Sequence, residues 1–270
     1  MATWSEAPGR RRASHRRAPA TGPGRRRQGR SWLARLGLIG SLAGLGVAAA
    51  GIVIGVLPRT FSTAQQQQIT AWEMGARWRA WTAGHIFPGT VRYQLPGSAL
   101  AGARGLELTA SRAGIAPQAA CRAAADPSLA RMLSRHGCVA VLRSTYSDAT
   151  GTMAVTVGVA VFRSAAAESA AAGDLPGGKA PPAVRAVPFP HTLAARFGNP
   201  QRQLSWAAGS GPYLIMAAAG FADGRPRVPQ AADAYATAEM LALARGAGQA
   251  VESGVGAQPP APRCPGTPGC

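Results

Sequence analysis

One uncharged stretch limits what this chain can fold into more than any other feature of its sequence. Residues 36–57 read LGLIGSLAGLGVAAAGIVIGVL and carry no charged side chain. A helix rises about 1.5 Å per residue, so this stretch would be about 33 Å long, enough to cross a hydrocarbon core of about 30 Å. The sequence therefore predicts a transmembrane helix at residues 36–57, with the lipid bilayer as its first partner.

Two other interpretations of residues 36–57 stay open. A secretory signal peptide also has a basic start and an apolar run, and Ala48, Ala49 and Ala50 offer a small-residue cleavage site. The apolar run continues beyond that site as GIVIGVL, which favours an uncleaved anchor. The third interpretation is a helix buried in the core of a soluble protein.

The residues before this span indicate its orientation. They contain ten arginines and one acid, Glu6, and so hold nine of the eighteen net positive charges of the chain. The arginines are Arg10, Arg11, Arg12, Arg16, Arg17, Arg25, Arg26, Arg27, Arg30 and Arg35. Basic residues near a span resist translocation and mark the cytoplasmic side. We expect a single-pass protein of the cell membrane with a cytoplasmic N-terminus and an extracytoplasmic C-terminal domain.

The basic tail, residues 1–35, has few large apolar side chains and is predicted to be disordered. A polybasic segment beside a span is attracted to anionic lipid head groups by about 1 kcal/mol per residue. The arginines nearest the span are the candidates for this contact: Arg25, Arg26, Arg27, Arg30 and Arg35. We expect no nucleic-acid partner, because only Trp4 and Trp32 accompany the arginines and no recognition module follows.

Glycines within the span form a pattern typical of helix pairs in lipid. Gly40 and Gly44, and then Gly51 and Gly55, repeat at a spacing of four on one helical face. Small residues at this spacing let two helices approach closely, so the pattern favours a homodimer through the span. Glycine and alanine are abundant throughout the chain, so a chance spacing is the alternative.

Residues 58–84 are predicted to form a juxtamembrane helix. Good helix formers run from Ala64 to Ala83, and Gly84 follows as a breaker. One helical face carries Ile69, Trp72, Ala76 and Ala80, and roughly the opposite face carries Met74, Trp78 and Trp81. We expect one face to pack on the outer domain and the other to meet membrane, partner or subunit. The alternative is that all three tryptophans are ordinary packing residues.

Residues 85–250 are predicted to form one extracytoplasmic α+β domain, a mostly antiparallel sheet packed with helices. Strands are expected at 90–95, 139–146, 152–162, 203–208 and 213–222, with an edge strand within 184–197. Helices are expected to begin near Pro117, Asp126, Ser164 and Asp233, the last reaching about Gly248. In the strand at 152–162, alternate valines point to a core, and the small residues opposite indicate close packing or a shallow exposed face. Residues 251–270 are predicted to be a flexible Pro/Gly tail.

Four cysteines all follow the span, in what should be an oxidising compartment. Cys121 and Cys138 are separated by two short predicted helices, and closing that loop would stabilise the fold by about 3 kcal/mol. Cys264 and Cys270, in CPGTPGC, could form a second bridge. Three pairings exist in principle, and local pairing is the simplest. A redox or metal role would need closer spacing or more clustered ligands.

One run of the outer domain also resembles a known group. The segment CRAAADPSLARMLSRH, followed by GCVAVLRSTYSDATGTMAVTVGVAVF, resembles uncharacterised single-pass, Ala/Arg-rich envelope proteins of GC-rich actinobacteria. The resemblance covers about fifty residues around this run and the position of the span. It implies a single-pass topology and a bond between Cys121 and Cys138, and it brings no activity with it.

The sequence shows no catalytic pattern. The acids are scattered, His85, His136 and His191 lack metal spacing, and Ser210 lacks the five-residue elbow of an α/β-hydrolase. We therefore expect no cofactor and no metal. The function expected is a membrane-anchored, non-enzymatic domain that binds an unknown envelope protein or ligand. The alternative is a cell-envelope enzyme whose site is assembled only in the fold.

Overall fold

A computed structural model describes residues 61–95, 105–175, 183–228 and 234–261 of the chain. The chain divides into two compact units after Pro58, and every described residue belongs to the second unit, residues 59–270. The predicted basic tail and span therefore lie outside the described residues. Within the described ranges, no helix is both long enough and apolar enough to cross a membrane.

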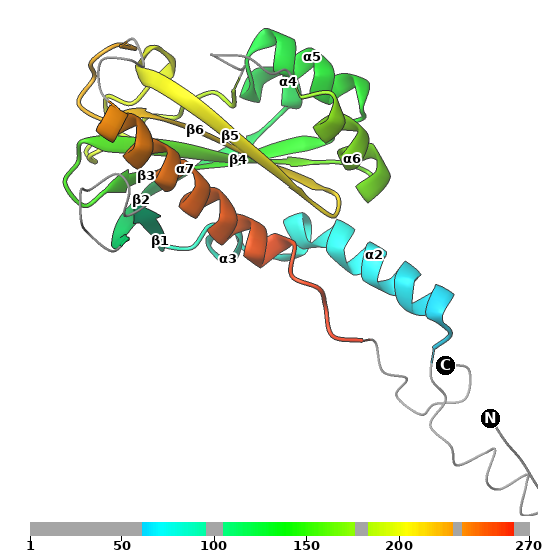
Figure 1. The fold of residues 1–270 in the computed structure, drawn as a ribbon. Helices are drawn as coiled ribbons and strands as arrows, with labels where there is room; N and C mark the ends of the chain where they lie inside the picture. Colours follow the sequence, from blue (N-terminus) through cyan, green and yellow to red (C-terminus); the bar gives the residue numbers. More distant parts are fainter. Residues whose placement is uncertain (1–60, 96–104, 176–182, 229–233, 262–270) are drawn as a thin grey trace, which may run out of the picture. The chain divides into compact units, whose positions relative to one another are not determined.

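Antiparallel strands form one curled sheet in the described part of the chain (Figure 1). The strands are β1 Thr90–Leu95, β2 Leu106–Ala119, β3 Ala140–Asp148, β4 Met153–Val161, β5 Arg202–Ser210 and β6 Tyr213–Phe221. Their order across the sheet is β1-β2-β3-β4-β6-β5, and each neighbouring pair is antiparallel. This sheet confirms the predicted α+β class.

Helices cover both faces of the sheet. They are α2 Thr63–Ala80, α3 Ala83–Ile86, α4 Cys121–Ala124, α5 Pro127–Arg135, α6 Ala165–Gly173 and α7 Ala234–Val255, with a 3-10 turn at Asn199–Gln201. On one face, the apolar residues of α7 join the larger core cluster, together with Ile86 of α3. On the other face, α4, α5 and α6 enclose a second core cluster. Figure 1 shows α7 lying across the sheet and α4, α5 and α6 on its far side.

The central strand β4 is buried on both faces. Val155, Val157 and Val159 point into the core under α7, as the alternation predicted. The small residues opposite do not form an exposed face, because Ala160 is fully buried in the second cluster. A Cβ atom added at Gly158 would lie only 2.7 Å from Cγ2 of Val184. The small side chains therefore allow a second layer to pack closely on the sheet.

Strand β2 differs most from the sequence prediction. A helix was expected to begin at Pro117, but β2 continues to Ala119 and contains that proline. The pairing with β3 shifts register between Arg112 and Gly114 and again between Ala116 and Ala119. Pro117 thus lies in an irregular stretch where a backbone donor is not needed for the ladder. The irregular register also explains why no alternating pattern marks this strand.

The segment expected to supply an edge strand within 184–197 instead crosses the second face of the sheet. Val184 forms an isolated bridge with Ala125. Further on, the Thr145 hydroxyl donates to the Val187 carbonyl (2.8 Å), and the Val187 amide donates to Oγ1 of Thr156 (3.1 Å). The edge-strand prediction is wrong because this backbone bonds to buried hydroxyls in the middle of the sheet.

The last helix is longer than expected. It begins at Ala234, close to the predicted start, but it ends at Val255 and not near Gly248. Val251 and Val255 are fully buried in the larger core cluster. The tail predicted to start at residue 251 therefore begins within a packed helix. Residues 262–270 lie outside the described part.

Candidate ligand-binding groove

A groove of about 680 Å³ lies where four parts of the domain meet. One wall is the part of α2 from Thr63 to Gly75. The other walls are residues 163–165 at the start of α6, residues 210–212 at the β5–β6 turn, and residues between 256 and 261 after α7. Figure 1 shows α2 and the end of α7 at the same end of the domain. We call this hollow the α2 groove.

Buried Arg77 fixes α2 to the end of α7. Its Nη1 donates to the carbonyl oxygens of Val255 (2.7 Å) and Ala257 (2.5 Å). These carbonyls belong to the last turn of α7 and the residues just after it, where a cation is favourable for the helix dipole. Glu73 lies 3.5 Å from Nη2, and the guanidinium stacks 4.8 Å from the Trp81 ring centroid. Arg77 thereby joins the first and last helices of the described domain.

A second contact fixes α2 to the β5–β6 turn. The buried Tyr213 hydroxyl donates to the Met74 carbonyl. Burial raises the pKa of this tyrosine, so it stays a protonated donor. Next to it, Gly211 has φ of +58°, and a Cβ atom there would lie 2.6 Å from Cε of Met74. Glycine is thus needed both for the turn and for the close approach of Met74.

The lining of the α2 groove combines an apolar floor with hydrogen-bonding groups. Ala71, Met74, Pro212 and Pro259 supply apolar surface. Polar side chains come from Gln66, Gln67, Thr70, Ser164, Ser210 and Arg163. A concave, partly apolar surface with a few polar groups from separate elements is typical of a ligand site. The arrangement suits a ligand or peptide with an apolar body and some hydrogen-bonding groups.

Helix α2 presents two different faces, as the sequence predicted. Met74 is buried, and Trp78 and Trp81 pack against the larger core cluster. Trp72, by contrast, is 74% exposed. Trp78 and Trp81 are therefore packing residues, whereas Trp72 contributes little to the core. What Trp72 contacts stays a prediction.

The disulfide between Cys121 and Cys138 is present as predicted. The two sulfur atoms are 2.05 Å apart. The bond joins the first residue of α4 to the chain just before β3, so it encloses α4 and α5. The other residues predicted to have a role lie outside the described ranges: Cys264, Cys270, Gly40, Gly44, Gly51, Gly55, Arg25, Arg26, Arg27, Arg30 and Arg35.

The three histidines of the described domain lie apart and have separate surroundings. His136 ends α5, and its Nε2 lies 2.8 Å from Oδ2 of Asp174. His85 lies edge-on to Trp81, with 4.3 Å between ring centroids. His191 has φ of +63° in the segment that crosses the second face. In the part of the chain that the structure describes, no three His, Cys, Asp or Glu residues are placed to hold a metal ion.

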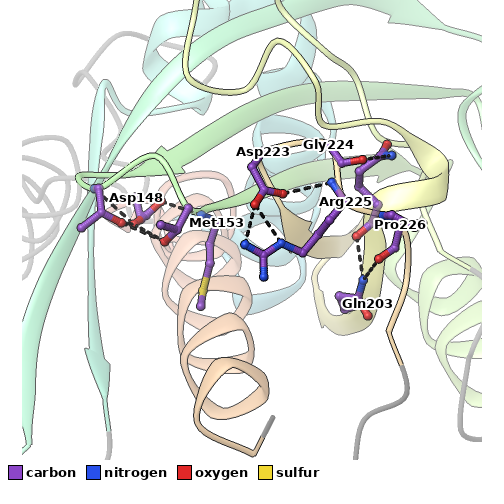
Figure 2. Close-up of polar contacts among 10 residues, drawn as sticks. Asp148, Met153, Gln203, Asp223, Gly224, Arg225 and Pro226 are labelled. Carbon is purple, nitrogen blue, oxygen red and sulfur yellow. Dashed lines mark hydrogen bonds and ion pairs between the residues drawn. The ribbon is translucent and has the colours of Figure 1, made fainter. Parts of the chain in front are cut away.

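Two of the scattered acids organise turns (Figure 2). Asp148 accepts from the Met153 amide (2.8 Å) and the Thr150 amide (3.2 Å), which closes the turn between β3 and β4. Asp223 accepts from the amide and Nε of Arg225, at 3.0 and 2.8 Å. Next to this loop, Gln203 donates to the Pro226 carbonyl (3.4 Å). Both carboxylates thus bond within their own turns.

Asp126 occupies the N-cap position of α5, as predicted, but its side chain does not cap the helix. Its carboxylate binds the Arg202 guanidinium through two hydrogen bonds (2.9 and 3.0 Å) and accepts from the Ala183 amide (2.9 Å). Burial alone would raise the pKa of Asp126. The bonds from Arg202 and Ala183, with the charges of Arg202 and Arg185, lower that pKa overall. Asp126 thus ties α5 to edge strand β5.

Comparison with known proteins adds nothing to this geometry. No family model, no curated protein and no solved structure matches the chain. Function must therefore be argued from the site itself.

Proposed function

We propose that this protein is a membrane-anchored domain that binds an envelope protein or ligand on the outer side of the cell membrane, without catalysing a reaction. The α2 groove is the proposed binding place. The basic tail is proposed to lie at the inner leaflet on anionic head groups, and the glycine pattern supports pairing through the span.

The disulfide is the observation that carries the proposed location. Disulfides persist in oxidising compartments and are rare in the cytosol. Cys121 is buried and belongs to the second core cluster, so the bond is part of the packed domain and not a surface accessory. A domain that depends on this bond is suited to the outer side of a membrane, which agrees with the arginine excess before the predicted span.

The groove supports binding because its walls are preformed. Arg77 and Tyr213 hold α2 in place through buried bonds, so a ligand would not have to order this helix. The groove also joins residues from both ends of the described domain, Thr63 and Ala261.

Two experiments on the full chain test the proposal. For topology, Cys264 and Cys270 are first replaced by serine, and a cysteine is placed at Ser14 or at exposed Ser169. In intact cells, a membrane-impermeant thiol reagent should label the Ser169→Cys protein and leave the Ser14→Cys protein unlabelled. The reverse pattern would refute the assignment. A product shorter by about fifty residues would show cleavage after Ala50.

For binding, a photo-crosslinking residue is placed at Gln67, which lines the α2 groove, or at its neighbour Gln68, which does not. Both side chains are exposed on the same helix, so they are a matched pair. A discrete crosslinked species from position 67 in native membranes, absent from position 68, would support the groove as the binding place. Equal crosslinking from both positions, or none from position 67, would count against it.

A further inference from the structure

Four arginines line an open hollow on the second face of the domain, away from the α2 groove. They are Arg122 of α4, Arg131 and Arg135 of α5, and Arg185 of the segment that crosses the sheet. The hollow has a volume of about 640 Å³, and its other lining residues are Pro127, Ala130 and Ser134. Among the described residues, no carboxylate lines it. We call it the arginine hollow.

Two acids next to residues of the arginine hollow, Asp126 and Asp174, are already engaged. Asp126 is held by two bonds from Arg202. Asp174 lies 2.8 Å from Nε2 of His136 and 3.8 Å from Nη2 of Arg135. In the described ranges, no carboxylate lies within 4.0 Å of the guanidinium groups of Arg122, Arg131 or Arg185. Of the four arginines, only Arg135 has a carboxylate within 4.0 Å among the described residues, so the hollow carries a net positive charge.

A fifth arginine, Arg143, interacts electrostatically with Arg185 of the hollow. Arg143 lies on β3 two residues after Val141, so it faces the same side of the sheet as the second core cluster. Burial and the charge of Arg185 lower the pKa of Arg143, and its buried Nε has no hydrogen-bond partner among the described residues. Like charges held close together in a partly buried place are unfavourable unless an anion joins them.

The backbone positions of these arginines are fixed. The Cys121–Cys138 bond encloses α4 and α5. The Arg185 amide donates to the Ala124 carbonyl (2.8 Å), and Val184 forms its bridge with Ala125. Arg122 and Arg185 are thus presented from two backbone segments that are bonded to each other. Such a frame lowers the entropy lost when a ligand binds.

We propose that the arginine hollow binds a phosphate group of an extracytoplasmic phosphate ester. Guanidinium groups present planar pairs of N–H donors that match the oxygens of phosphate, and several such groups around one hollow suit a group with more than one negative charge. This proposal adds a ligand class to the proposed binding function. It rests on the proposed outward orientation in one respect only, the compartment in which the phosphate ester is found.

Hydrogen exchange of the full chain in nanodiscs of phosphatidylcholine tests the proposal, with inorganic pyrophosphate as the probe. The basic tail also attracts anions, so the readout must be local. Pyrophosphate should slow amide exchange saturably in residues 121–137 and 183–187. In the double variant Arg131→Gln, Arg185→Gln the apparent affinity at these peptides should fall at least about tenfold. The control Arg245→Gln removes one exposed charge from α7, on the other face of the sheet. This variant should leave the apparent affinity for pyrophosphate unchanged.

The source of the phosphate is decided by a second arm. Protection of the same peptides in phosphatidylglycerol nanodiscs without pyrophosphate identifies a lipid head group, whereas protection by pyrophosphate alone identifies a soluble ester. No saturable protection at these peptides, or an equal loss in the Arg245→Gln protein, would overturn the proposal. Neither result affects the thiol labelling of Ser14→Cys and Ser169→Cys. The anion-site proposal and the proposed outward orientation can therefore be refuted independently.

Discussion

Glu168 is a buried carboxylate without a compensating charge. It lies on α6 with 5% of its surface exposed, and its Oε1 has no hydrogen-bond partner among the described residues. A Cβ atom at Gly209 of β5 would lie 2.2 Å from this oxygen, so the carboxylate fits against bare backbone. Burial raises the pKa of Glu168, and no neighbouring charge contributes to the shift.

This raised pKa predicts a pH-dependent stability. Between the unfolded pKa near 4.5 and the higher folded pKa, the folded state binds more protons than the unfolded state, so stability falls as the pH rises. Glu168→Gln should therefore stabilise the protein by about 1 to 2 kcal/mol at pH 7 and by almost nothing at pH 4. Urea unfolding at the two pH values measures this. Glu107→Gln, at a half-exposed carboxylate, is the control. An equal gain at both pH values would contradict the explanation.

Single residues with distant partners were beyond the reach of the sequence. The burial of Val155, Val157 and Val159 was predictable because the alternating pattern lies within one short stretch of sequence. Arg77 lies between Ala76 and Trp78, where an arginine normally indicates a solvated face. Its partner, the Val255 carbonyl, is 178 residues away in the chain. Nothing in the local sequence marks such a contact.

At the scale of elements, the contact between β4 and the crossing segment sets a limit on side-chain size. Gly158→Ala would place a methyl group 2.7 Å from Cγ2 of Val184, which is closer than packed carbon atoms allow. We expect a loss of about 1 to 3 kcal/mol in unfolding free energy. Hydrogen exchange should also rise at residues 183–187.

The matched control is Gly173→Ala at the end of α6, where an added Cβ atom meets nothing within 4 Å. It should leave stability unchanged or raise it slightly, because alanine favours helix. If Gly158→Ala were as well tolerated as Gly173→Ala, the close packing of the crossing segment would be wrong.

Elements with regular patterns were predicted well, and irregular ones were not. The strand at 90–95 was predicted with its observed bounds, and α6 begins after Ser164, whose side chain accepts from the Ala167 amide (3.2 Å). The predictions for the region of β2 near Pro117 and for the segment within 184–197 were wrong. Both segments contain prolines, and β2 also shifts register, so the alternation on which strand prediction depends is lost.

At the scale of the whole molecule, the disulfide links composition, compartment and stability. Cys138→Ser should remove about 3 kcal/mol of stability and lower the melting temperature of the full chain by roughly 6 to 12 °C, because a closed loop restricts the unfolded state. Protease sensitivity of the domain should rise. Removal of residues 264–270 should leave both measurements nearly unchanged.

Peptide mapping without reduction checks the pairing itself. A peptide pair containing Cys121 and Cys138 is expected. A link from Cys121 to Cys264, or free thiols at Cys121 and Cys138 in protein isolated from membranes, would contradict it.

The fold class followed from the sequence because consecutive hairpins can only pair antiparallel through short turns. The order of strands did not follow. The central strand β4 pairs with β6 and not with β5, the next strand along the chain. Which strand pairs with β4 depends on how well each candidate packs beside a strand that is buried on both faces. The side-chain pattern alone does not distinguish β5 from β6 in this respect. The α2 groove was missed for a similar reason, because its walls come from four separate parts of the chain.

The bond from Arg77 to the end of α7 has a mechanical consequence. The first and last described segments meet at one place, where Thr63 and Ala261 line the same groove. Tension applied between residues 61 and 261 would act first on the contacts that hold α2, those of Arg77 and Tyr213, and would separate α2 from α7. The hydrogen-bonded ladders of the sheet would carry most of the load only after those contacts had broken. The domain would then respond to pulling by opening at this groove while the sheet stayed intact.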